Sequence, residues 1–474
     1  MFASHERPSG VVDLPSAGVP SDHGLATLGL LMQLAGRTSS ALAALVASFV
    51  VLDARAHRHA GWLLFALALC IVRSQLHRIA GRDLVYGRRT LDGEVACPFD
   101  ATRTYLAFGL GHAVVIGLVA TTELGATTRT GAGIAAALAL WPAMLAIALQ
   151  PSRFPALQGG IPLGEDRGLE SASILMSILG ACGILSSGAM LVVVGTLPNR
   201  HLQHGWGFMF LFVFALLLVR SWCHVRAGLA GLRELSFDRP GDLAAQYVRI
   251  GVIGAFFIGG VLALLTMAER VAPEALVSVI VVCWLLTAWP LILKRYFNHR
   301  QFAELLAGDR VIHRRAPDTG LTGLGWLLAG HGILVAASLI LEVTVQRPGM
   351  GRVLDGLLQL VGPFGDAAGR VHRIEHGLGA VGVALELIAA GALIRMSSRR
   401  RALATLYGVV AGGVALAVAW PMLRTVGHHF DLRLAARLIP ASIQLVMPAA
   451  TLLLVHRASV PAAQARYRTG PTRP

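Results

Sequence analysis

Four ionisable side chains interrupt apolar stretches that are long enough to cross a membrane, and they are the groups best placed to do chemistry. They are one arginine, one glutamate and two histidines, namely Arg37, Glu386, His112 and His331. An ionisable group in hydrocarbon is costly unless it is paired or hydrated, so such residues mark paths for ions, protons or substrates. Counting about 1.5 Å per residue from the predicted cytoplasmic ends places all four roughly 12 to 18 Å deep. We therefore expect one layer of charge near the midplane of the membrane.

The simplest way to keep Arg37 and Glu386 charged is an ion pair between them, with His112 and His331 relaying protons beside it. A related stretch has Ala181 at the position of Arg37, so the fold itself does not demand an arginine there. Two structural alternatives stay open. The pair could serve only to lock helices together, or Arg37 could extend its guanidinium towards the headgroups.

A second set of candidates comes from sequence that recurs. The stretch HAGWLLFALALCIVRSQLHRIAG at 59–81 returns in similar form, HGWGFMFLFVFALLLVRSWCHVRAG, at 204–228. Its arginine is repeated as Arg73 and Arg220, and we align Arg395 with them in a third copy. We expect these arginines to anchor the cytoplasmic ends of their helices, where they complement the helix dipole. The alternative is a ring of three cations that attracts anions.

The same stretch begins with a histidine, which recurs as His59, His204 and His376. Threefold packing would bring three imidazoles to one level, as a zinc or copper site requires. The alternative, which we favour, is a polar residue in the interfacial aromatic belt beside Trp62 or Trp206. No other histidine or cysteine has the spacing of metal ligands, and no nucleotide-binding or nucleophile motif is present. We therefore predict no cofactor, and we favour neither a metal site nor a catalytic residue.

The composition is that of a protein embedded in a bilayer. Of its 474 residues 55% are hydrophobic and 14% are charged, with a mean hydropathy of +0.64, far from the balance of soluble domains. The formal net charge is +15, but most basic residues flank apolar runs and therefore orient helices rather than bind nucleic acid. We expect the partners to be the bilayer, its anionic headgroups and, through the basic loops, a soluble cytoplasmic protein.

Apolar runs of about 17 to 25 residues predict an all-α polytopic membrane protein with about twelve transmembrane helices. The loops after even-numbered spans carry more arginine than the loops after odd-numbered spans, which places both termini in the cytoplasm by the positive-inside rule. This orientation and the arginine-rich coding bias favour the bacterial inner membrane. The predicted spans are centred near residues 38, 66, 113, 141, 184, 214, 258, 283, 332, 386, 412 and 446.

The repeat gives the domain organisation. Asp22, Asp166 and Asp318 precede the first, fifth and ninth spans, where an aspartate caps the helix that follows. This spacing predicts three parallel units of four spans each. We expect tails at 1–21 and 458–474, units at 22–154, 166–297 and 318–457, a linker at 155–165, a basic linker at 298–317 and an outer-face insertion at 346–370.

Three functions are compatible with these features, and we rank first a transporter or channel for a small solute, with the midplane charges coupled to protons. The second is a non-catalytic membrane subunit or scaffold that docks partners on its basic cytoplasmic loops. The third is a membrane enzyme that modifies a lipid, or that binds haem between His112 and His331. Catalytic motifs are missing, so we lean against an enzyme. The first function predicts a polar cavity that reaches Arg37 and Glu386.

Overall fold

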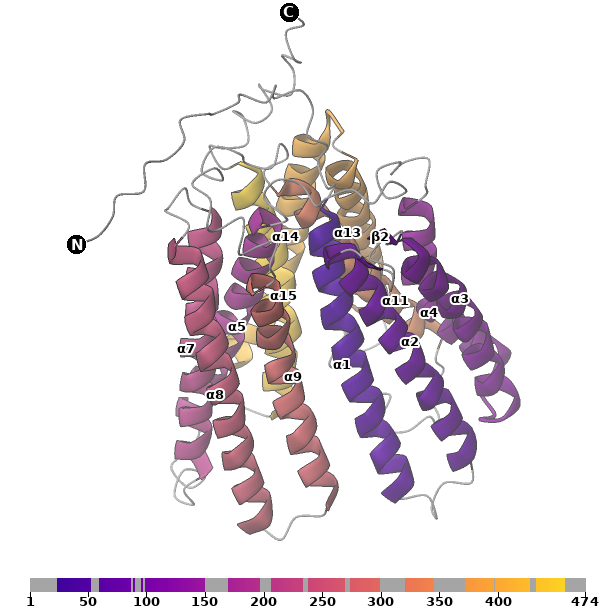
Figure 1. Ribbon diagram of the computed structural model, residues 1–474, viewed down its shortest axis with the longest axis horizontal. Coiled ribbons are helices and arrows are strands. Elements are labelled where there is room, and N and C mark those ends of the chain that lie inside the picture. Colours follow the sequence, from indigo (N-terminus) through magenta and orange to yellow (C-terminus); the bar gives the residue numbers. More distant parts are fainter. Residues whose placement is uncertain are drawn as a thin grey trace, which may run out of the picture.

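The computed structural model describes residues 24–52, 59–86, 88–89, 95–96, 99–149, 169–196, 206–232, 238–268, 273–298, 320–344, 371–395, 397–426 and 432–456. Within these ranges the chain forms twelve helices and one antiparallel pair of two-residue strands, β1 (Arg88–Arg89) and β2 (Val95–Ala96) (Figure 1). The predicted helical class is confirmed. The helices are α1 Leu25–Leu52, α2 Ala60–Tyr86, α3 Phe99–Thr122, α4 Thr128–Ala148, α5 Leu169–Thr196, α7 Trp206–Leu232, α8 Asp238–Ala268, α9 Pro273–Phe297, α11 Leu321–Thr344, α13 Val371–Ile394, α14 Arg400–Val426 and α15 Leu432–Val455.

Several of the helices have the length and the apolar composition of membrane spans. Among the described residues, seven of them are long and apolar enough to cross a bilayer, namely α1 to α5, α7 and α11. Each of the twelve predicted span centres falls inside one of the helices, and the remaining five spans stay predictions. Large apolar side chains such as Phe256 and Leu453 are 70% and 75% exposed, as expected for a surface that faces lipid.

The helices fall into three groups of four, which we name by their order in the chain. In the first bundle α1 packs on α2, α2 on α3 and α3 on α4. The second bundle, α5, α7, α8 and α9, and the third bundle, α11, α13, α14 and α15, are packed in the same order. Small residues allow the first two helices of a bundle to approach closely. A Cβ on Gly36 would lie 2.6 Å from the carbonyl oxygen of Ser74, and one on Gly180 would lie 2.7 Å from the backbone nitrogen of Val225.

The three bundles contact one another in a closed cycle. The fourth helix of each bundle packs on the first helix of another, in the pairs α4 with α11, α9 with α1 and α15 with α5. The first helices α1, α5 and α11 also contact one another, which places them at the centre of the ring. Gly24 has a φ of +72°, and a Cβ there would lie 2.6 Å from the backbone nitrogen of Gly323. The central contact therefore requires a glycine at the start of α1.

Several predicted segments lie outside the described residues. They include the capping residues Asp22, Asp166 and Asp318. They also include the linker beyond residue 298, the insertion at 346–370, the tails at 1–21 and 458–474 and the linker at 155–165.

Candidate functional site

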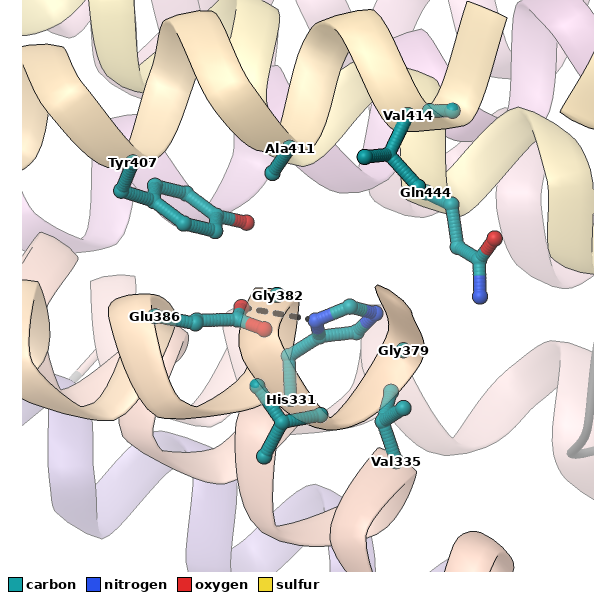
Figure 2. A pocket seen from close by; sticks show the side chains of 11 residues that line it. His331, Val335, Gly379, Gly382, Glu386, Tyr407, Ala411, Val414 and Gln444 are labelled. Carbon is teal, nitrogen blue, oxygen red and sulfur yellow. Dashed lines mark hydrogen bonds and ion pairs between the residues drawn. The ribbon is translucent and has the colours of Figure 1, made fainter. Parts of the chain in front are cut away.

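A cavity lies inside the third bundle, where side chains from all four of its helices converge (Figure 2). It offers about 70 Å³ to the centres of water molecules, and a single water needs roughly 10 to 15 Å³ of such space. The cavity therefore has room for several waters or for a small polar solute. Its polar lining residues are His331 from α11, Glu386 from α13, Tyr407 from α14 and Gln444 from α15.

The polar centre of this cavity is the contact between His331 and Glu386, which is an ion pair when the imidazole is protonated. Nδ1 of His331 lies 2.7 Å from Oε1 of Glu386, and the two side chains are 18% and 4% exposed. A proton on Nδ1 forms a hydrogen bond to the carboxylate. This bond is attractive both when the imidazole is neutral and when Nε2 is protonated as well. That nitrogen, Nε2, points away from Glu386 (Figure 2). It can therefore exchange a proton with the cavity while the pair stays intact.

Two further polar side chains face the ion pair. Tyr407 is buried, and its hydroxyl interacts with the carboxylate of Glu386 from the opposite wall. Gln444 points its amide into the same space, on the side of His331 (Figure 2). An amide and a hydroxyl both donate and accept hydrogen bonds. The cavity can therefore hold water or a solute that makes several hydrogen bonds at once.

In the first bundle an arginine and a tryptophan fill the space between the second, third and fourth helices. Arg73 donates from Nη2 to a backbone carbonyl of α4 at 2.7 Å. Trp141 donates from Nε1 to Nε2 of His77 at 2.9 Å. The His77 ring stacks on Tyr105 with ring centroids 4.5 Å apart. We refer to these four residues as the first filled site.

The second bundle repeats this cluster contact by contact. Arg220 donates to a backbone carbonyl of α9 at 2.6 Å. Trp289 donates to Nε2 of His224 at 2.8 Å, and His224 stacks on Tyr247 with centroids 4.2 Å apart. We refer to these four residues as the second filled site. In both filled sites the histidine accepts a hydrogen bond from the indole N–H and its ring stacks on tyrosine, so the site is closed by packed side chains.

The packing of the first two helices gives the register between the first and third bundles. A Cβ on Gly29 of α1 would lie 2.6 Å from the carbonyl oxygen of Gly81 in α2. In the same way, a Cβ on Gly325 of α11 would lie 3.0 Å from the carbonyl oxygen of Ala390 in α13. Gly81 and Ala390 therefore hold equivalent places on their helices.

This register relates the cavity to the filled sites. His77 stands four residues before Gly81 in the sequence, and Glu386 stands four residues before Ala390. Arg73 precedes His77 by one helical turn, and the residue one turn before Glu386 is Gly382. The cavity of the third bundle thus lies where a glycine replaces the arginine of the filled sites.

The predicted layer of four charges is assembled only in part. His331 and Glu386 meet, but the expected ion pair between Arg37 and Glu386 is not formed. Arg37 instead interacts electrostatically with Arg78 and Arg295, at the junction of the first and second bundles. Depth along a helix is readable from the sequence, whereas the direction of the side chain around the helix axis depends on which helices become neighbours.

His112 and His331 have different surroundings. His112 belongs to the first bundle, where Nδ1 lies 3.2 Å from Nη1 of Arg73 and Nε2 lies 3.5 Å from Sγ of Cys70. His331 belongs to the third bundle and contacts Glu386. The two histidines therefore lie in different bundles and do not face each other across a site for a haem.

The three aligned arginines do not converge. Arg73 and Arg220 lie well inside their helices and donate into their own bundles. Arg395 lies just beyond the last residue of α13 and is exposed. The expected ring of three arginines is not formed. We aligned Arg395 with Arg73 from the similarity of the residues around it, whereas the helix packing places Gly382 at the position equivalent to Arg73.

The three repeated histidines are described only in part. His59 is exposed at the start of α2. His204 and the side chain of His376 lie outside the described residues. Among the side chains whose positions are described, no group of three or more histidine, cysteine, aspartate or glutamate residues could hold a metal ion.

Sequence reasoning missed Tyr407 and Gly382, which line the cavity beside the pair of His331 and Glu386. Tyr407 continues the series of Tyr105 and Tyr247, and this signal was present in the sequence. Gly382 gave no signal, because its role is to leave space.

Comparison with models of protein families, with curated proteins and with solved structures finds no match to this chain.

Proposed function

We propose that this chain is a transporter or channel for a small polar solute, in which movement is coupled to protons at the His331–Glu386 pair. The observation that carries the proposal is the buried pair of His331 and Glu386 at the wall of a cavity that Tyr407 and Gln444 also line. Ionisable groups inside membrane proteins mark ion and substrate pathways. A purely structural pair needs no open space beside it.

The proposed architecture has twelve spans in three parallel repeats of four, covering 22–154, 166–297 and 318–457. Both termini face the cytoplasm of a bacterium, and the protein lies in its inner membrane. The common order of packing within the three bundles supports the repeat. The two filled sites, which match contact by contact, support it independently.

The chemistry of the cavity follows from the charge of the pair. When the imidazole of His331 is neutral, the pair carries the single negative charge of Glu386 and attracts a cation or a hydrogen-bond donor. When a proton binds at Nε2, the pair becomes neutral overall and this attraction is lost. Binding of a proton and binding of a cationic solute are therefore mutually exclusive. That is the requirement for exchange of one for the other.

The proposal is tested by proton flux in liposomes that contain the purified protein and a trapped pH-sensitive dye. A panel of small cations, including ammonium and the alkali metals, is added outside to drive exchange. The wild-type protein should dissipate a pH gradient with at least one member of the panel. Glu386→Gln should lower that flux by about tenfold or more, because the negative charge that binds the cation is gone.

A matched control is Glu123→Gln, which removes an acidic side chain just after the end of α3. This variant should keep the wild-type flux. Equal flux in Glu386→Gln and the wild type, both correctly folded, would exclude the pair from the mechanism. Absence of flux in the wild type with every cation would contradict the proposal as a whole. The scaffold function would then be favoured, since it requires no exchange at Glu386.

A further inference from the structure

Three arginines gather at the junction of the first and second bundles, away from the cavity. Arg37 comes from α1, Arg78 from α2 and Arg295 from the last turn of α9, which packs on α1. A Cβ on Gly36 would lie 3.0 Å from the Cβ of Arg78, so the first two arginines stand beside the same close contact. The guanidinium of Arg295 lies 5.2 Å from the ring centroid of Tyr86. Arg37 interacts with the charges of both other arginines.

The described residues do not neutralise these three charges. Nε of Arg37 and Nε of Arg78 are buried without a hydrogen-bond partner. Within the described ranges, no carboxylate lies within the 4.0 Å of an ion pair from any of the three arginines. The carboxylate of Asp83, which follows Arg78 on α2, bonds to Arg82, at 2.9 Å. Three positive charges at a partly buried junction between helices repel one another unless an anion binds between them.

The helix packing itself does not require these charges. In the second bundle Gly180 makes the contact that Gly36 makes in the first, and there the opposing residue is Val225 instead of Arg78. Ala181 follows Gly180 where Arg37 follows Gly36. Since apolar residues make the same contact, the packing of α1 on α2 does not by itself account for two arginines at this place.

We infer that Arg37, Arg78 and Arg295 form a binding site for a phosphate group. A guanidinium forms paired hydrogen bonds to phosphate oxygens, and a bound phosphate group would offset part of the combined positive charge of the three arginines. Arg295 is exposed at the end of α9, where phospholipid headgroups lie if this helix ends at the membrane surface. The phosphate belongs either to an anionic lipid headgroup or to a free phosphate in solution, and these sources are separated by experiment.

The test measures thermal unfolding of the full-length protein with two probes. In the first arm the protein is placed in nanodiscs of phosphatidylcholine, with or without phosphatidylglycerol. In the second arm it is kept in a neutral detergent and titrated with inorganic phosphate at constant ionic strength. A rise in Tm with phosphatidylglycerol alone assigns a lipid headgroup, and a rise with inorganic phosphate assigns a free phosphate. No rise in either arm would overturn the inference.

Variants locate the effect. Arg37→Gln and Arg78→Gln should each weaken the apparent affinity of the stabilising probe by about tenfold, the loss expected for one charge-assisted hydrogen bond. If neither variant folds, Arg295→Gln at the exposed helix end carries the same test. The control is Arg226→Gln, an exposed arginine on α7, which should keep the wild-type affinity. An equal loss in the control would show a general charge effect and would overturn the site.

Discussion

The first and third bundles use the same helix packing but treat the space between their helices in opposite ways. In the first bundle Arg73 crosses to a carbonyl of α4, and Trp141 covers His77. In the third bundle Gly382 and Gln444 line a cavity instead. The comparison teaches that the cavity does not arise from a different fold. It lies where Gly382 replaces the arginine of the filled sites within one fold.

The titratable group changes along with the space. His77 of the first filled site accepts a hydrogen bond from an indole, a group that neither gains nor loses a proton near neutral pH. Glu386 at the equivalent position instead supplies a carboxylate, which pairs with the imidazole of His331. The third bundle therefore combines an open space with a proton-binding pair. The four residues of the first filled site pack against one another and include no carboxylate.

The strongest test of this comparison is to close the cavity with the arginine of the filled sites. A Cβ on Gly382 would meet no atom within 4 Å, so the side chain of Gly382→Arg can leave the backbone without a clash, and it should place a guanidinium beside Glu386. Modification of Glu386 by a hydrophobic carbodiimide, followed by mass spectrometry, should then slow by about tenfold or more. Gly382→Ala is the control, since a methyl group leaves the cavity open. Unchanged labelling of Gly382→Arg would contradict the equivalence of the two sites.

The next largest effect is expected from separating the ion pair. His331→Leu leaves the buried carboxylate of Glu386 without its basic partner, and removal of one partner of a buried pair costs about 3 kcal/mol. The free energy of unfolding in detergent should fall by that amount. Replacing both residues, in His331→Leu with Glu386→Leu, should recover most of the loss, because a leucine pair leaves no buried charge. If the double variant is as unstable as the single one, the pair is not the source of the effect.

These expectations depend on features that the sequence reveals unequally. The helices could be predicted because membrane spans are long apolar runs, and every predicted centre lies within a helix. The common depth of His331 and Glu386 also followed from counting residues along two spans. The identity of the residue that pairs with Glu386 did not follow from such counting. Arg37 stands at a similar predicted depth, but its neighbours are Arg78 and Arg295. Neither the helix neighbours nor the empty space at Gly382 is encoded in a local pattern.

A smaller effect is expected from emptying the first filled site. Arg73→Leu removes the donor to the carbonyl oxygen of Leu138, and an unpaired buried carbonyl costs about 2 kcal/mol. Arg220→Leu should cost a similar amount, because Arg220 makes the matching bond to Leu286. Denaturant unfolding of the two variants measures both values. A large loss in one variant and none in the other would separate the two filled sites energetically.

The smallest effect concerns the indole hydrogen bond, and it tests how closely the bundles correspond. Trp141→Phe keeps most of the ring volume but removes the donor to Nε2 of His77, so it should lower the free energy of unfolding by about 1 kcal/mol. Trp289→Phe should do the same in the second bundle. Gln444→Leu in the third bundle should be nearly neutral, because its amide faces a cavity in which water can replace its hydrogen bonds. Differential scanning fluorimetry of the three variants under identical conditions gives the order. If Gln444→Leu proved the most destabilising, its amide would be a structural partner like the indoles, and the third bundle would be closed in the same manner as the first.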